Sequence, residues 1–314
     1  MAGEIPPPLL MAAALGILPS TPYLWMATKL GQPNWVRTLL EDGADIEEKG
    51  GKEDTTPLHE AALHGHEPVT QLLLAHEADV SSKDAHGETP LGVASSHGHE
   101  AVALLLIEHR ADVSAKTNKG ETALIGAAGC GLDAMVGLLI QHQADVSSRT
   151  NYGKTALIGA ARGGHETTAR LLIQLGADVL AKDFAGMTAL HYAAMGVHET
   201  VMRTLIELGA NIAATDIMGQ TVLHCASYQG HETVVRLLLD AGADEQDQGT
   251  YTTGTPEILA TDGGHHQVAA ILKAEGVRRA QCVAFAMGHH ARLGVGSRVE
   301  ELDPGVVRMV LDEV

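Results

Sequence analysis

The feature that most constrains this chain is a pattern that returns every 33 residues. Three different markers keep the same step, which chance does not explain, so the chain is built from repeated units. A His-Glu pair marks units at His66-Glu67, His99-Glu100, His165-Glu166, His198-Glu199 and His231-Glu232. A threonine marks them at Thr56, Thr89, Thr122, Thr155, Thr188 and Thr221. An Ala-Asp or Ala-Asn pair closes them at Ala78, Ala111, Ala144, Ala177, Ala210 and Ala243.

Each unit is expected to form two short helices. Thr89-Pro90 is typical of a helix start, because threonine caps free amide groups and proline suits the first turn. Gly98 ends this helix where a left-handed backbone is needed. Val102 and Leu106 then form the buried stripe of a second helix. Such a hairpin hides its apolar face only against its neighbours, and the low aromatic content of 3% suits thin layers of alanine, leucine and valine.

Residues 56–66, TPLHEAALHGH, and residues 84–116 resemble the ankyrin repeat, whose hallmark is a TPLH-x-A opening. The resemblance covers about residues 21–277 and implies an all-α ankyrin-repeat solenoid. Its units are stacked helix-turn-helix layers with projecting β-hairpin fingers, and the fingers and first-helix ends line a protein-binding surface. We therefore expect an apolar capping segment (1–20), a repeat domain (21–277) and a helical tail (278–314). Within the domain we expect a cap (21–50), repeats one to six (51–83, 84–116, 117–149, 150–182, 183–215 and 216–248) and a degenerate repeat seven (249–277).

Several departures from the family pattern predict local differences. Gly92, Ile125 and Ile158 stand where His59, His191 and His224 follow the threonine, so repeats two to four should lack a threonine–histidine contact. Gly126 and Gly159 lie inside first helices, where each costs about 1 kcal/mol relative to alanine. Val197 stands where other repeats have a helix-ending glycine. Because a β-branched residue resists the left-handed conformation, we expect a shifted turn there.

Composition limits the partner and the compartment. The formal net charge of −18 argues against nucleic acid and, taken over the whole chain, favours a partner with a basic patch. The cysteines Cys130, Cys225 and Cys282 form no CxxC pair, which suits a reducing compartment, so we expect an intracellular protein, cytoplasmic or nuclear. The apolar stretch Leu9–Leu18 is too short to span a bilayer, so we expect no membrane partner. Oligomeric state is not predicted.

No cofactor, metal or catalytic site is expected. His64/His66, His97/His99 and His289-His290 are close in sequence, but one histidine per repeat puts successive rings about 10 Å apart, too far to share an ion. The chain has no GxSxG elbow, P-loop or dinucleotide motif, so we expect a protein that is not an enzyme. Cys130 and Cys225 are expected to be small buried or half-buried side chains.

The candidate partner-binding residues are those that the repeat does not need. They lie in the loop that begins each repeat, which we call its finger, and at the end of its first helix. The fingers of repeats four to six carry apolar side chains at positions that normally face solvent, a pattern typical of protein interfaces. We expect a hydrophobic anchor cluster of Tyr152, Phe184, Met187, Met195, Ile217, Met218 and Tyr228, with Lys154 and Arg162 beside it. The alternative is that these tips pack on one another or on the chain's own tail.

The tail leaves two interpretations open. Asp303-Pro304 begins an amphipathic helix that contains Val306, and the simpler interpretation is a cap on the last repeat. The stretch also faintly resembles the suppressor-of-cytokine-signalling box, with Cys282 and Leu302 as the matching residues. That resemblance implies a ubiquitin-ligase substrate adaptor as the alternative to a general scaffold.

Overall fold

The computed structural model describes residues 21–249 and 254–293, which form a row of helix pairs. The first helices of the pairs are α2 (Thr21–Lys29), α4 (Pro57–Leu63), α6 (Pro90–Ser96), α8 (Ala123–Gly129), α10 (Ala156–Gly163), α12 (Ala189–Met195), α14 (Val222–Gln229) and α16 (Pro256–Asp262). The second helices are α3 (Pro33–Glu41), α5 (Glu67–Ala75), α7 (Glu100–Glu108), α9 (Asp133–Gln141), α11 (Glu166–Gln174), α13 (Glu199–Glu207), α15 (Glu232–Asp240) and α17 (His266–Leu293). The predicted all-α solenoid is confirmed. The expected capping segment 1–20 lies outside the described residues.

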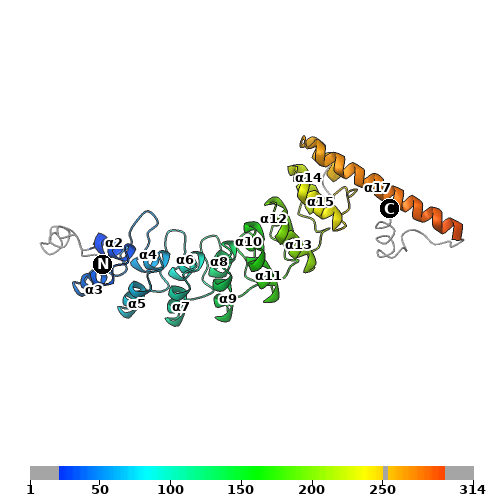
Figure 1. Cartoon of the computed structure of the whole chain (residues 1–314). Coiled ribbons are helices and arrows are strands. Elements are labelled where there is room, and N and C mark those ends of the chain that lie inside the picture. The colour runs from blue at the N-terminus through cyan, green and yellow to red at the C-terminus, as the bar shows by residue number, and fades with distance from the viewer. Residues whose placement is uncertain (1–20, 250–253, 294–314) are drawn as a thin grey trace, which may run out of the picture.

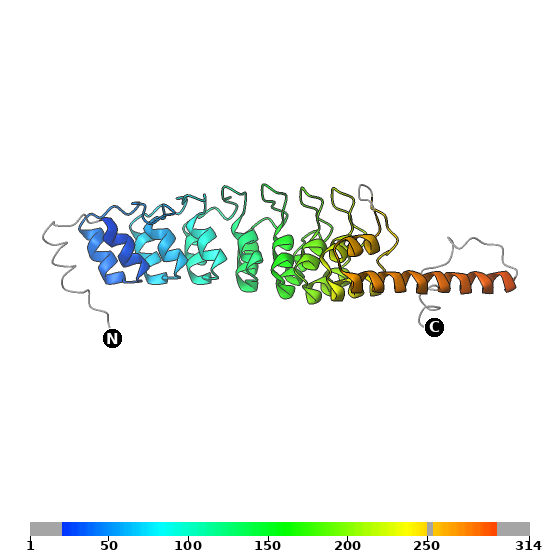
Figure 2. The ribbon, with the colours of Figure 1, turned by 90° about the horizontal axis from the view of Figure 1, so that it is seen from above.

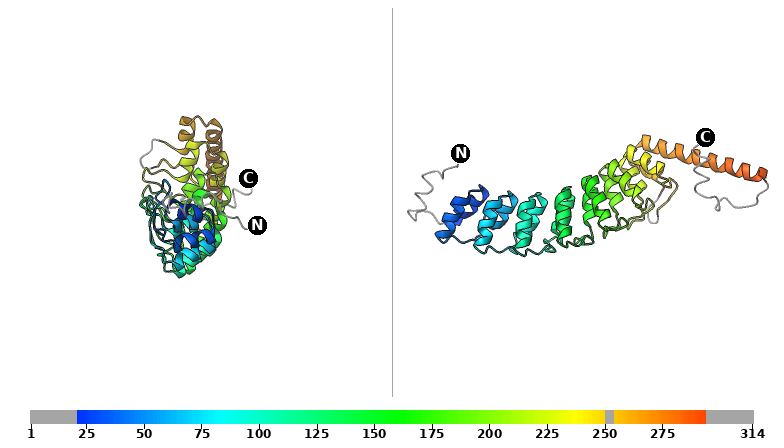
Figure 3. Two further views of the ribbon diagram at one scale, coloured as in Figure 1. Left: turned by 90° about the vertical axis from the view of Figure 1, so that its left-hand side faces the viewer. Right: turned by 60° about the horizontal axis from the view of Figure 1, so that its bottom comes forward.

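The helices form two parallel rows, with first helices in one and second helices in the other (Figure 1). First helices of adjacent repeats pack more closely than second helices do, so the stack bends toward the row of first helices (Figure 1). The right panel of Figure 3 shows the curved stack from another side. Seen from above, the fingers line one edge of the stack (Figure 2). Fingers and first helices therefore form one continuous surface.

The first helices start where the threonines predict. In repeats two to four the Thr89, Thr122 and Thr155 hydroxyls accept hydrogen bonds from backbone amides three residues ahead, at 3.3–3.4 Å. In repeats one, five and six a histidine takes part: Thr188 Oγ1 lies 2.9 Å from His191 Nδ1, and the matching distances are 2.8 Å at Thr56–His59 and 2.7 Å at Thr221–His224. The expected division between the repeats with and without this contact is confirmed.

The core runs through the layers from end to end. Leu58 and Ala61 of a first helix and Leu73 of the second are almost completely buried, and the same positions are buried in later repeats. Leu24 and Ala27 occupy these positions in the N-terminal pair. Burying a leucine side chain contributes about 2 kcal/mol, whereas alanine lets adjacent first helices approach closely. Each layer therefore depends on its neighbours for stability.

Each finger is a closed loop hydrogen-bonded to the next. Within one finger Asp183 N donates to Met187 O at 3.0 Å, and the Asp183 carboxylate accepts from two more finger amides. Between fingers Phe184 N donates to Tyr152 O, and Ile217 N donates to Ala185 O, both at 3.0 Å. In the described residues, strand pairing is limited to two isolated bridges, Gly50–Thr55 and Thr215–Thr221. The fingers are thus held by turns and by one another.

The expectation of a shifted turn at Val197 is wrong. Val197 has φ +58°, in the left-handed region where Gly65, Gly98 and Gly164 lie. Its amide donates to Ala194 O at 3.1 Å, and the next amide donates to Ala193 O at 2.9 Å, as in the glycine repeats. These bonds and the packing of the two helices fix the turn. The valine accepts a left-handed backbone at a cost of about 1–2 kcal/mol.

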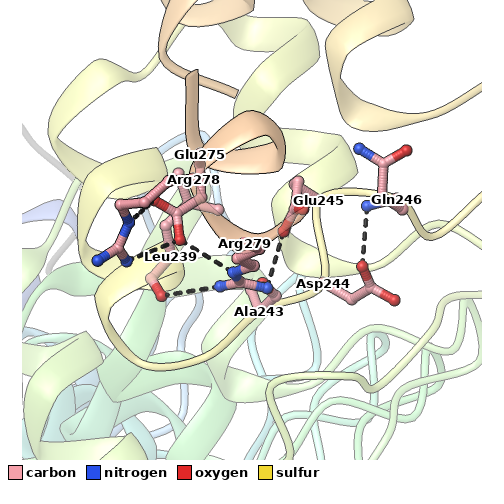
Figure 4. Close-up of polar contacts among 8 residues, drawn as sticks. All are labelled: Leu239, Ala243, Asp244, Glu245, Gln246, Glu275, Arg278 and Arg279. Carbon is pink, nitrogen blue, oxygen red and sulfur yellow. Dashed lines mark hydrogen bonds and ion pairs between the residues drawn. The ribbon is translucent and has the colours of Figure 1, made fainter. Parts of the chain in front are cut away.

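The last second helix continues beyond the stack. The boundary that we expected at residues 277 and 278 falls inside α17, which runs without a break through Cys282 to Leu293. Arg279 fastens it to the preceding repeat: its guanidinium lies 2.7 Å from a carboxylate oxygen of buried Glu245 and 3.0 Å from the carbonyl oxygen of Ala243 (Figure 4). Glu275 accepts a further bond from Arg279 at 2.9 Å. Leu302, Asp303-Pro304 and Val306 of the expected tail helix lie outside the described residues.

Within residues 21–249 and 254–293, no helix combines the length and the apolar character that crossing a membrane requires.

Candidate functional site

The structure places most of the expected anchor cluster at exposed positions. Phe184 is the most open, with 70% of its surface exposed. Met187 is the exception, because it closes its finger and is half-buried. The exposed members at finger tips are Tyr152, Phe184, Ile217 and Met218, and those at the ends of first helices are Met195 and Tyr228. They lie on the continuous surface of fingers and first helices in three consecutive repeats.

The aromatic side chain at finger five rests on the backbone of finger four. Gly153 has φ +79°, and a β-carbon there would lie 2.7 Å from the Phe184 ring. Tyr152 N donates to Thr150 Oγ1 at 3.2 Å, and Tyr152 O accepts from Phe184 N. The two exposed aromatic residues are therefore held on adjacent, mutually bonded loops. A surface whose backbone is fixed in this way loses little entropy when a partner binds.

A polar network that the sequence analysis did not identify lies beneath these tips. Tyr192, half-buried on α12, donates its hydroxyl to Asp183 Oδ2 at 2.7 Å. Burial and the adjacent Asp183 carboxylate raise the pKa of Tyr192 well above its usual range, so the phenol stays protonated. Lys154 extends from finger four, with Nζ 4.8 Å from the Tyr192 ring centroid in a cation–π contact. The sequence signal that could have revealed this network is Tyr192 itself, a large aromatic residue at a position that other repeats fill with Gly126, Gly159 or Cys225.

Arg162 combines a structural backbone with a free side chain. It lies at the end of α10, where its carbonyl oxygen accepts a hydrogen bond from His198 Nε2 at 3.1 Å. Its guanidinium is exposed and, within the described residues, has no carboxylate partner. Arg162 and Lys154 therefore add two positive charges beside the apolar cluster.

Several histidines link adjacent repeats by hydrogen bonds. His66, His99, His165 and His198 each place Nε2 3.0–3.1 Å from a carbonyl oxygen at the end of the preceding repeat's first helix. The His64–His66 and His97–His99 ring pairs stack, with centroids 5.7 and 6.3 Å apart. In the part of the chain that the structure describes, no three His, Cys, Asp or Glu side chains are grouped to hold a metal ion.

The two cysteines considered for reactivity differ in environment. Burial raises the pKa of the Cys225 thiol to about 11, so it is protonated and poorly nucleophilic at neutral pH. Cys130 is exposed at the end of α8, which corrects the expectation that it is buried or half-buried. We find no base positioned beside either thiol among their described hydrogen bonds.

Comparison with known proteins agrees with this architecture. The family described as ankyrin repeats (3 copies) matches residues 23–117, 109–183 and 182–249. The chain therefore belongs to the ankyrin-repeat family, whose repeats mediate protein–protein interaction. Comparison with curated proteins gave no significant match.

Among solved structures, the chain is similar to the ankyrin repeat domain of human ASB11. The identity is 25% and the TM-score 0.64, over 70% of this chain and 98% of that one. In all, 591 solved chains are similar, so the fold is widely shared and does not by itself identify a partner.

Proposed function

We propose that this protein is a non-catalytic scaffold that binds a partner protein across the fingers and first-helix ends of repeats four to six. The observation that carries the proposal is a row of exposed apolar side chains on consecutive fingers that are hydrogen-bonded to one another. These side chains are Tyr152, Phe184, Ile217 and Met218. Large aromatic and methionine side chains are enriched at interfaces and contribute strongly to binding. The binding set comprises Tyr152, Lys154, Arg162, Phe184, Met187, Met195, Ile217, Met218 and Tyr228.

We place this activity inside the cell, in the cytoplasm or the nucleus. The thiols of Cys130, Cys225 and Cys282 are free in the structure. Such unpaired, sparse cysteines suit a reducing compartment.

The experiment compares partner capture by three forms of the protein from the same cell lysate. The Phe184→Ala/Met218→Ala variant removes two anchors, whereas Leu180→Ala removes an exposed apolar side chain outside the cluster. We expect mass spectrometry to show proteins that wild type and Leu180→Ala retain and that the double variant loses. Identical capture by all three, with unfolding curves that confirm an intact fold, would contradict the proposal.

The ubiquitin-ligase adaptor is not favoured by any observation on the described residues. Cys282, which the box resemblance uses, is buried within continuous α17, and Leu302 and Val306 lie outside the described part. Ligase subunits that bind wild type and are lost on Cys282→Ser would support that alternative.

A further inference from the structure

Positive charge is concentrated on the surface proposed to bind the partner. Residues 115–131, 148–164 and 181–197 hold the fingers and first helices of repeats three to five. Of the chain's 21 Lys and Arg they contain six, but of its 39 Asp and Glu only Glu121 and Asp183. The matching segments of repeats one, two and six each carry one more acidic than basic residue. The six basic residues are Lys116, Lys119, Arg149, Lys154, Arg162 and Lys182.

None of these six side chains forms a direct ion pair in the described residues, although Lys116 interacts electrostatically with the carboxylate of exposed Asp145. The ion pairs of the described residues lie elsewhere, on second helices, on α17 and at two histidines, and none includes the six. Lys116, Arg149 and Lys182 each donate to the carbonyl oxygen of the residue 33 positions ahead, at 3.0, 2.6 and 2.6 Å. These neutral acceptors orient the side chains in a row and leave their charge in place. Asp183 is buried and bonded to Tyr192 and two finger amides.

Distance decides whether a partner responds to this local charge or to the net charge of −18. At physiological ionic strength, interactions between exposed charges fall off within about 8 Å. Successive repeats are about 10 Å apart, the usual spacing of packed helices. A segment lying on repeats three to five is therefore governed by the six cations. This reverses the expectation of a basic partner, which rested on the charge of the whole chain.

The basic surface continues directly into the anchor cluster. Lys119, Lys154 and Arg162 precede Phe184 along the stack, and Ile217, Met218 and Tyr228 follow it. An extended chain advances about 3.3 Å per residue, so about three of its residues span one repeat. One bound segment thus reaches both regions.

We propose that the partner segment is acidic at one end and apolar at the other. Its acidic end lies over repeats three and four, and its apolar end lies over repeats five and six. This inference rests on the proposed function, since it names the chemistry of the segment that the same surface binds. A nucleic acid is disfavoured, because it carries no apolar side chains to contact the exposed anchors Phe184, Ile217 and Met218.

The test measures binding of labelled probes to the full chain by fluorescence anisotropy. The probes are a peptide with a glutamate-rich half and a leucine-rich half, the same peptide with lysine in place of glutamate, an all-leucine-and-serine peptide, and single-stranded DNA. Lys119→Glu/Arg162→Glu reverses two charges on the basic surface. Arg203→Glu/Lys273→Glu is the matched control, because these exposed residues lie on second helices.

We expect the glutamate–leucine peptide to bind more tightly than the lysine–leucine peptide and the DNA. The Lys119→Glu/Arg162→Glu variant should weaken that binding about tenfold, and the control should leave it within a factor of two or so. Added salt should weaken wild-type binding and have little effect on the variant. Absence of measurable glutamate–leucine binding, equal or tighter binding of the lysine peptide, or tighter binding of DNA would overturn the inference.

The two proposals fail in different ways. If Phe184→Ala/Met218→Ala weakens binding of the leucine–serine peptide while the acidic preference is missing, the anchor surface stands and its charge chemistry is wrong. If the acidic preference is present and this variant binds every probe as wild type does, the anchors are wrong.

Discussion

The Nε2 atom of His198 lies 3.1 Å from the carbonyl oxygen of Arg162, and its ring lies against Gly164, where a β-carbon would be 2.7 Å away. The same arrangement joins His99 to Gly65 and His165 to Gly131. Each such histidine therefore links two repeats and requires a glycine beneath it. In the described structure, His231, which follows the repeat with Val197, makes no corresponding bond.

Val197→Gly should stabilise the protein. The change removes a left-handed valine, worth about 1–2 kcal/mol, and frees the space that the His231 ring needs to bond the carbonyl at the end of α12. We expect a higher midpoint of urea unfolding. The combined variant Val197→Gly/His231→Ala separates the two effects, because only the backbone gain should survive in it. A lower midpoint for the single variant would show that the valine side chain stabilises the turn.

Gly159→Ala should also stabilise the protein, by about 1 kcal/mol, because alanine has the higher helix propensity. Gly159 lies inside α10, and a β-carbon there would be 3.6 Å from its nearest neighbours, an ordinary contact distance. Gly164→Ala, only five positions along, is the matched control. It combines φ +77° with a close approach to His198, and it should destabilise the protein by about 2 kcal/mol. Urea unfolding of each variant would measure both changes in stability. Equal effects of the two substitutions would contradict this account.

Stability should fall as the solution is acidified below neutral pH. Burial lowers the pKa values of His59, His191 and His224 below that of an unfolded histidine, which is about 6.5. The unfolded chain then binds more protons than the folded one. The stability that depends on neutral imidazoles is therefore complete above about pH 6.5 and is lost as pH falls through the folded-state pKa.

His191→Ile tests this dependence, since isoleucine naturally holds the same position at Ile125 and Ile158. Urea unfolding at about pH 7.5 and about pH 5.5, on either side of the histidine pKa, should show a smaller loss of stability in the variant than in wild type. An unchanged difference between the two pH values would mean that His191 does not contribute to the dependence.

Arg279→Met should destabilise the C-terminal repeat by about 2 kcal/mol, because it leaves the buried Glu245 carboxylate without its cation. Hydrogen exchange should show faster opening at the end of α15 and in α17. Arg278→Met is the control: its guanidinium is exposed and bonds Glu275 alone, so its loss should cost at most about 1 kcal/mol. Glu245→Gln/Arg279→Met should recover part of the stability, and failure to do so would argue against the ion pair.

The sequence predicted the fold well because its signals are local and repeated. Thr89 and Thr122 mark the starts of first helices both in the sequence pattern and in the structure. Leu58 and Ala61 mark two core positions that recur every 33 residues. Val197 was mispredicted because its neighbours, rather than its own preference, fix the turn. Glycine and valine adopt the same backbone conformation at this position, because the packing of two helices and two backbone hydrogen bonds already define it.

The candidate surface was predicted only in part. Exposure of Phe184 and Met218 followed from their place in the repeat, because finger tips face solvent. The Lys154–Tyr192–Asp183 network did not, since it joins a finger of one repeat to the finger and first helix of the next. The charge of this surface was also missed, because a total over 314 residues conceals where the charges lie.

The row of basic side chains that each reach a carbonyl 33 positions ahead has an evolutionary consequence. Donor and acceptor are separated by one whole unit, so the clasp does not depend on which unit supplies it. Excising residues 117–149 in one piece would bring Lys116 opposite the carbonyl of Lys182, the partner that Arg149 has now. A gene of this kind can lengthen or shorten by duplication and deletion of whole repeats, while the hydrogen bonds between adjacent repeats stay the same.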